Sequence, residues 1–281
     1  MLDLFCGAAG GWSLGLHRAG FQTVAACEID PARRAAFSHN NPCVRMYDDI
    51  RNLSAARLRR DLGFLPEVIA GSPPCQDAST ANPNGKGIKG ERTGLFTEYV
   101  RLVREINPRW VAAENVPGFR TRGADWVLDA LEALGYACWP LVVGAEHAGA
   151  PHERKRVWFI ARDTNEARLA QRQGQRGHAQ PQFAPPQRAG VQAFDADEDQ
   201  RRSSASDQEI ARHVAALERA TGTRRIQFNH GPARHLRVAD GVPPRLARQC
   251  IAAYGDSVVP QITEALGNAI RRTELMLAEV A

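Results

Sequence analysis

A thiol and a carboxyl group each follow a short apolar stretch of this chain. Cys75 lies in the turn Ser72-Pro73-Pro74-Cys75-Gln76, directly after Val68–Ala70, and Glu114 directly follows Val111–Ala113. Short apolar runs are typical of buried parallel strands, and an α/β sheet places its reactive groups at the carboxyl ends of such strands. A cysteine and a carboxyl group at one edge of a sheet predict covalent chemistry with proton transfer.

Both residues also have a structural interpretation. Cysteine is commonly an inert thiol inside a core, although this fits poorly with the polar turn that holds Cys75. A glutamate at the end of a strand often forms only a salt bridge, and taken alone Glu114 leaves that interpretation open.

A turn of small residues follows the first apolar stretch. The run Asp3-Leu4-Phe5-Cys6-Gly7-Ala8-Ala9-Gly10-Gly11 predicts a strand, a glycine-rich turn and the start of a helix, whose N-terminal N–H groups can bind an anion. Glu28 ends the second predicted strand, where an acidic residue accepts hydrogen bonds from ribose hydroxyls. Because the spacing is not GxGxxG, the pattern favours a nucleoside cofactor that ends in a carboxylate. The alternative is a tight turn with a solvated Glu28.

Residues 1–162 alternate short apolar runs with helical patterns, which predicts an α/β fold with a mostly parallel sheet and helices on both faces. The predicted strands are Leu2–Phe5, Thr23–Cys27, Val44–Met46, Val68–Ala70, Trp110–Ala113, Cys138–Val143 and Val157–Ala161. Helices are predicted from Asp30-Pro31 onward, over Leu95–Ile106 and over Trp126–Leu134.

The composition changes after this part of the chain. From about residue 164 to 230, Gln, Arg, Ala, Ser and Pro dominate, which is equally compatible with a partly disordered insertion and with a small recognition module. Ordered patterns return from Arg237 to the end of the chain. We therefore predict a catalytic and cofactor-binding domain formed by residues 1–163 and 237–281, interrupted at 164–236 by a small irregular target-recognition region.

The composition of the chain further limits the class of protein to which it can belong. The chain has 281 residues and 43% hydrophobic residues, enough for one large domain with a real core. No apolar run approaches the length of a membrane span, and six cysteines without a CxxC spacing predict a reducing cytoplasm and no metal site. A net charge of +5 is compatible with an anionic partner without requiring one.

Taken in order, the motifs resemble those of the DNA cytosine-C5 methyltransferases of bacterial or phage type. The resemblance spans nearly everything outside residues 164–230 and implies a Rossmann-like fold, S-adenosylmethionine as cofactor and double-stranded DNA as partner, with the chain acting as a monomer. It implies a cofactor site formed by Phe5, Gly7, Gly10, Glu28, Ile29, Asp49, Ile50, Pro74, Asp256, Ser257 and Val258.

The same resemblance assigns the chemistry. Cys75 is expected to attack C6 of cytosine, Glu114 to protonate N3, and Arg156 to hold the O2 side, with Arg154 as a second catalytic candidate. An Arg/Lys cluster at the start of a strand is otherwise often only solvated surface. The residues expected to contact nucleic acid are Gln76, Ser79, Lys86, Lys89 and Asn115, and residues 77–94 could form a lid over a flipped base.

The sequence also departs from the family pattern. The first loop is one residue longer than usual, Asp77 adjoins the nucleophile, and position 256 is Asp where the family usually has Asn, which adds a negative charge near the carboxylate of the cofactor. Two alternatives stay open: methylation of cytosine C5 in tRNA, which the Pro-Pro-Cys-Gln turn does not exclude, and a relative that binds nucleic acid with weak or no turnover, which Asp256 and the sparse recognition region leave possible.

Overall fold

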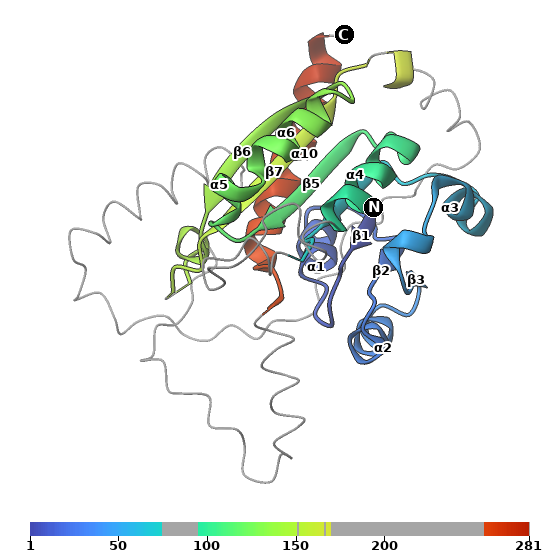
Figure 1. Ribbon diagram of the computed structural model, residues 1–281. Coiled ribbons are helices and arrows are strands. Elements are labelled where there is room, and N and C mark those ends of the chain that lie inside the picture. Colours follow the sequence, from blue (N-terminus) through green and yellow to red (C-terminus); the bar gives the residue numbers. More distant parts are fainter. Residues whose placement is uncertain (75–94, 151, 166, 170–255, 281) are drawn as a thin grey trace.

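The computed structural model describes residues 1–74, 95–150, 152–165, 167–169 and 256–280. Its centre is a seven-stranded sheet of order β3-β2-β1-β4-β5-β7-β6 (Figure 1). The strands are β1 Leu2–Leu4, β2 Ala25–Cys27, β3 Arg45–Tyr47, β4 Val68–Gly71, β5 Trp110–Asn115, β6 Tyr136–Val143 and β7 Arg156–Asp163. The first five strands are parallel, whereas β7 is antiparallel to both β5 and β6. The prediction of a mostly parallel sheet is confirmed.

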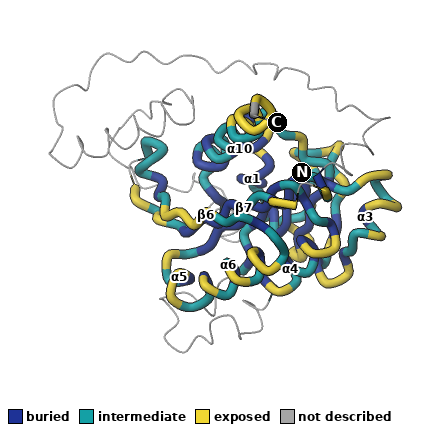
Figure 2. The backbone as a smooth tube through the Cα atoms, turned by 90° about the horizontal axis from the view of Figure 1, so that it is seen from above, coloured by how far each residue is buried: buried dark blue, intermediate teal, exposed yellow. Residues whose placement is uncertain are grey.

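Helices cover both faces of this sheet (Figure 2). One face packs against α3, α4, α5 and α6, and the other against α1 and α10, with α2 beside them. The helices are α1 Gly11–Arg18, α2 Pro31–Asn40, α3 Ala55–Leu62, α4 Leu95–Ile106, α5 Phe119–Arg122, α6 Ala124–Glu132 and α10 Pro260–Val280, with short 3-10 turns η1 Ile50–Asn52 and η3 Ala145–Ala148. None of the helices described is long and apolar enough to cross a membrane.

Local sequence signals account for several boundaries. The side chain of Asp30 caps α2 by accepting hydrogen bonds from the backbone N–H groups of Ala32 and Arg33, and Pro31 occupies the first turn. Helix α4 spans the predicted residues Leu95–Ile106, because six of its apolar side chains lie on one buried face. The predicted strands all form, with ends shifted by one or two residues. Helix α6 begins and ends two residues earlier than predicted.

Helix α10 returns to the first helix of the fold. The hydroxyl of Thr263 donates to the carbonyl of Gly11, and both helices share an apolar cluster that includes Trp12, Leu16 and Ile262. A residue some 250 positions away in sequence therefore stabilises the start of α1. The division into two domains stays a prediction, since most of residues 164–236 lies outside the described chain.

A buried carboxylate fixes the first turn of α1. Oδ2 of Asp3, in β1, accepts hydrogen bonds from the backbone N–H of Ser13 at 3.1 Å and from its hydroxyl at 2.6 Å. Asp3 is fully buried, and its Oδ1 has no hydrogen-bond partner among the described residues. Burial raises the pKa of Asp3 to about 7, and the two hydrogen bonds from Ser13 only partly oppose that increase.

We expect the replacement Gly15→Ala to weaken the contact between α1 and α10. A Cβ atom on Gly15 would lie 1.9 Å from Oγ1 of Thr263 and 2.3 Å from the carbonyl oxygen of Pro260. Urea unfolding should show a loss of about 2–3 kcal/mol for this overpacked variant. The exposed His17→Ala on the same helix should stay within about 0.5 kcal/mol. Equal stabilities of the two variants would contradict this packing.

The raised pKa of Asp3 predicts a pH-dependent stability. The pKa of Asp3 is higher in the folded than in the unfolded protein. The free energy of unfolding is therefore highest below the unfolded-state pKa, and it falls as the pH rises towards the folded-state pKa of about 7. Asp3→Asn, which keeps an oxygen acceptor for Ser13, should therefore gain on the order of 1–3 kcal/mol relative to the native chain between pH 5 and pH 8. Denaturant titrations at both pH values test this, and parallel pH profiles would refute it.

Candidate active site at the carboxyl ends of the strands

The two strands that precede the predicted catalytic residues lie side by side. In the parallel pair β4 and β5, Gly71 is opposite Ala113, so the residues after each strand emerge at the same edge of the sheet. The side-chain amide of Asn115 donates to the carbonyl of Pro73 at 3.3 Å, which ties the two strand ends together. The chain is described as far as Pro74. Cys75, Gln76, Ser79, Lys86 and Lys89 lie outside the described residues, and their roles stay predictions.

Glu114 and Arg156 form a buried ion pair at this edge. Nε of Arg156 lies 2.8 Å from Oε1 of Glu114, whose side chain is 9% exposed. The pair forms because β7 runs antiparallel beside β5, which brings the first residue of β7 next to the end of β5. Burial raises the pKa of Glu114, and the cation of Arg156 and a hydrogen bond from the Ser72 hydroxyl partly offset this effect. The structure thus brings together two of the four predicted catalytic residues.

Arg154 makes a different contact. Its guanidinium donates to the backbone carbonyl of Ser257 at 2.7 Å, and its backbone has a positive φ of 37°. Burial and the neighbouring Arg156 lower the pKa of Arg154. This side chain therefore connects the predicted base-binding edge to the segment that precedes α10.

The glycine-rich turn holds Glu28 through its backbone. The N–H of Gly7 donates to Oε2 of Glu28, and the N–H of Asp30 donates to Oε1, both at 2.9 Å. Phe5 and Gly7 have φ values of 58° and 63°, so the chain bends sharply after β1. Each carboxylate oxygen still has a lone pair for a further donor, which suits a ribose diol.

The other predicted cofactor residues differ in the solvent exposure of their side chains. Ile29 is apolar and 60% exposed, so its side chain is accessible to a ligand. Ile50 is buried, and the carboxylate of Asp49 is held by Arg51, whose hydrogen bonds lower the pKa of Asp49. A ligand contact at this position would therefore use the backbone more readily than the Asp49 carboxylate.

The segment Asp256–Val258 lies against the start of α1. A Cβ atom on Gly11 would be 2.5 Å from the carbonyl oxygen of Val258 and 2.8 Å from Oγ of Ser257, so only glycine allows this approach. Gly10, the N-cap residue of α1, has a φ of 57°. The structure thus assembles Gly10, Ser257 and Val258 at the N-terminus of α1, while Glu28 and Ile29 follow the adjacent β2.

Sequence reasoning missed two residues of this region. Ser72 hydrogen-bonds to Glu114 and also accepts from Nε1 of Trp12 at 3.0 Å, and its place in the turn before Cys75 was an available signal. Arg33 pairs with Asp256 at 2.6 Å, and no local pattern indicates this contact.

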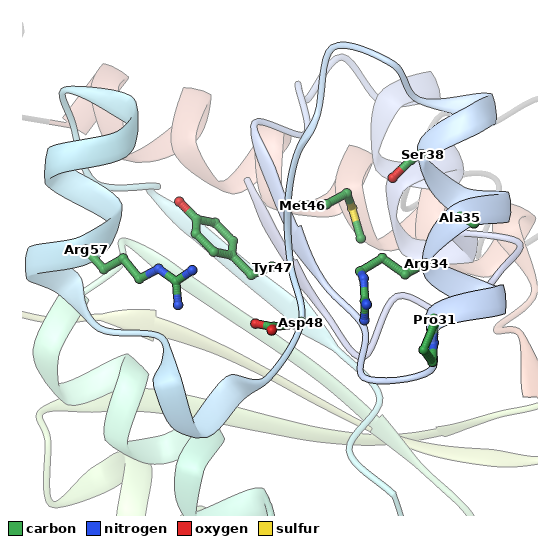
Figure 3. A pocket seen from close by; sticks show the side chains of 8 residues that line it. All are labelled: Pro31, Arg34, Ala35, Ser38, Met46, Tyr47, Asp48 and Arg57. Atoms are coloured by element: carbon green, nitrogen blue, oxygen red, sulfur yellow. The ribbon is translucent and has the colours of Figure 1, made fainter.

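A separate pocket of about 440 Å³ lies between α2, β3 and α3 (Figure 3). Its arginines are already engaged: Arg34 donates to the carbonyls of Glu28 and Ile29, and Arg57 lies 5.0 Å from the centre of the Tyr47 ring. None of the residues that line the pocket is among the predicted site residues, and Arg34 connects the pocket to the backbone of the segment that carries Glu28.

The arrangement of the sheet is shared with a known enzyme fold. The structure resembles the crystal structure of a protein described as a DNA modification methyltransferase encoded within a prophage (E. coli), with a TM-score of 0.50. The two sequences are 31% identical, and the match covers 59% of this chain and 47% of the other. The fold is that of a methyltransferase. More particularly, the chain belongs to the C-5 cytosine-specific DNA methylase family, whose profile matches residues 1–235.

Curated relatives agree with this assignment. The chain is 33% identical over 164 residues to the type II methyltransferase M.FnuDI of Fusobacterium nucleatum, covering 57% of this chain and 46% of the relative. It is 36% identical over 169 residues to M2.BsuMI of Bacillus subtilis, covering 57% and 41%. The chain thus spans less than half the length of these relatives.

Methyltransferases of this kind generally use S-adenosylmethionine as methyl donor. The residues present fit such a cofactor. Glu28 offers acceptors for ribose hydroxyls, and Ile29 offers an exposed apolar surface. The N-terminus of α1 offers N–H groups for a carboxylate. Among the described residues, no three His, Cys, Asp or Glu side chains are grouped to hold a metal ion.

We predict that Arg156→Leu destabilises the protein more at high pH than at low pH. Removing the guanidinium raises the pKa of the buried Glu114 further. A buried carboxyl group with a raised pKa lowers the free energy of unfolding as the pH rises through its folded-state pKa, because the group must then ionise inside the protein. The loss at pH 8.5 should be about 3 kcal/mol and much smaller at pH 5. Chemical denaturation in a Glu114→Gln background is the control, since the pH dependence should vanish there; its persistence would contradict the pairing.

Proposed function

We propose that this chain transfers a methyl group from S-adenosylmethionine to C5 of cytosine in double-stranded DNA. The observation that carries the proposal is the buried Glu114–Arg156 pair, which lies at the same edge of the sheet as the turn leading to Cys75. The glycine-rich loop and Glu28 follow strands β1 and β2 of the same sheet. Membership of the C-5 cytosine-specific DNA methylase family supports the reaction and the substrate.

The chemistry follows from what each side chain can do. Cytosine C5 is a poor nucleophile, and addition of the Cys75 thiolate to C6 gives C5 enamine character. Burial raises the pKa of Glu114, which favours transfer of a proton to N3 as negative charge develops on the ring, while Arg156 partly opposes that increase. Bound S-adenosylmethionine would supply the methyl group and would leave as S-adenosylhomocysteine. Transfer of the C5 proton to a base such as water would then expel Cys75 as its thiolate.

Arg156 has two functions in this proposal. Its guanidinium holds the Glu114 carboxyl group in place, and its remaining donors can reach the O2 side of the base. The base must leave the duplex to enter the site, at a cost of a few kcal/mol in lost stacking and pairing. The net charge of +5 favours association with DNA, and the expected setting is a bacterial cytoplasm with the chain acting as a monomer.

Base-resolution bisulfite sequencing tests the proposal. DNA from a methylation-free host that expresses this chain should show methylated cytosines in a defined sequence context, and Cys75→Ala should remove them. If the folded native chain leaves DNA unmodified, DNA methylation is refuted. Transfer of labelled methyl groups to tRNA then tests the RNA alternative, and DNA binding without transfer tests the inactive relative.

We expect Glu114→Gln to reduce kcat by about 10²–10⁴-fold while its affinity for DNA stays nearly unchanged. The amide keeps the shape of the carboxyl group but cannot donate an acidic proton to N3. Single-turnover methylation and a DNA-binding titration separate the two effects. A variant that methylates at the native rate would show that Glu114 has only the structural role of an ion pair.

A further inference from the structure

Position 256 creates an electrostatic problem for the proposed cofactor site. Asp256 begins the segment that lies against the N-terminus of α1, where Gly11 would clash with Ser257 and Val258 if it carried a Cβ atom. The N-cap residue Gly10 contributes no side-chain cap, and Asp3 accepts from the N–H of Ser13 only, so the other N–H groups of this first turn suit an anion such as the carboxylate of an amino acid. Because Asp256 directly precedes Ser257, its unneutralised carboxylate would repel that anion.

Arg33, in α2, forms an ion pair with this acid. Its NH2 group lies 2.6 Å from Oδ2 of Asp256, across 223 positions of sequence. The backbone of Arg33 is fixed in the first turn of α2, because its N–H donates to the capping side chain of Asp30. Asp30 also donates its own N–H to Glu28, so the cation is anchored to the same loop that carries the ribose-binding acid.

The pair is open to solvent, with the side chains of Arg33 and Asp256 35% and 60% exposed. Exposed ion pairs contribute little to folding stability, so the contact is poorly explained as a stabilising device. The position of the pair is more informative than its strength, since it joins the first turn of α2 to the segment that borders the N-terminus of α1.

We propose that Arg33 neutralises Asp256 and thereby allows the cofactor site of this chain to accept the carboxylate of its ligand. The inference rests on the proposed function, because it assumes a nucleoside cofactor that ends in an amino acid. Arg33 acts as a positioning and charge-compensating residue for binding and takes no part in methyl transfer.

Calorimetric titration with two probes tests the inference. S-adenosylhomocysteine carries the amino-acid carboxylate, and 5′-methylthioadenosine is a nucleoside thioether without it. Arg33→Ala should weaken binding of the first probe roughly five- to tenfold and leave the second unchanged, because only the first meets the exposed charge of Asp256. Arg33→Ala/Asp256→Asn should restore the native affinity, and Arg33→Lys should nearly preserve it.

The outcomes are distinct. Equal binding of S-adenosylhomocysteine by Arg33→Ala and the native chain overturns the inference alone. Equal weakening of both probes, or no restoration in the double variant, also overturns it, since the effect would then be structural. If the native chain binds neither probe, the proposed function fails together with the inference. Thermal unfolding of each variant confirms that the fold is kept.

Discussion

The buried pair of Glu114 and Arg156 is the contact on which the site depends. A carboxyl group at the end of a central strand loses most of its solvation, and burial raises its pKa. The adjacent cation offsets part of that cost and holds the group at one place. Because β7 runs antiparallel between β5 and β6, its first residue arrives beside the last residues of β5. The reversal of one strand therefore places a cation beside a carboxyl group that burial alone would leave without a partner.

Close backbone approach connects the distant parts of the chain to this edge. Gly11 and Gly15 allow the segment Asp256–Val258 and the start of α10 to pack on α1 without side chains between them. The hydroxyl of Thr263 bonds to the carbonyl of Gly11 and to that of Pro260. The site thus draws on both ends of the described chain, and its geometry depends on their packing.

Two arginines hold the segment that precedes α10. Arg154 reaches the carbonyl of Ser257 from the loop before β7, and Arg33 reaches the carboxylate of Asp256 from α2. Arg154 also lies close enough to Glu114 to lower the pKa of that carboxyl group. The edge at the ends of β5 and β7 and the loop that carries Glu28 are therefore connected through one short segment.

The sequence by itself determined the elements and most of the residues at their ends. Apolar runs predicted all seven strands, the Asp30-Pro31 signal predicted the start of α2, and the positions of Glu28 and Glu114 after apolar stretches predicted where acids would emerge. These signals are local, since they depend on periodicity and on capping within a few residues. Only the tertiary structure decided the place of β7, the contact of Arg154 with Ser257, and the pairing of Arg33 with Asp256. Such contacts join residues far apart in sequence, and the packing of the whole sheet fixes them.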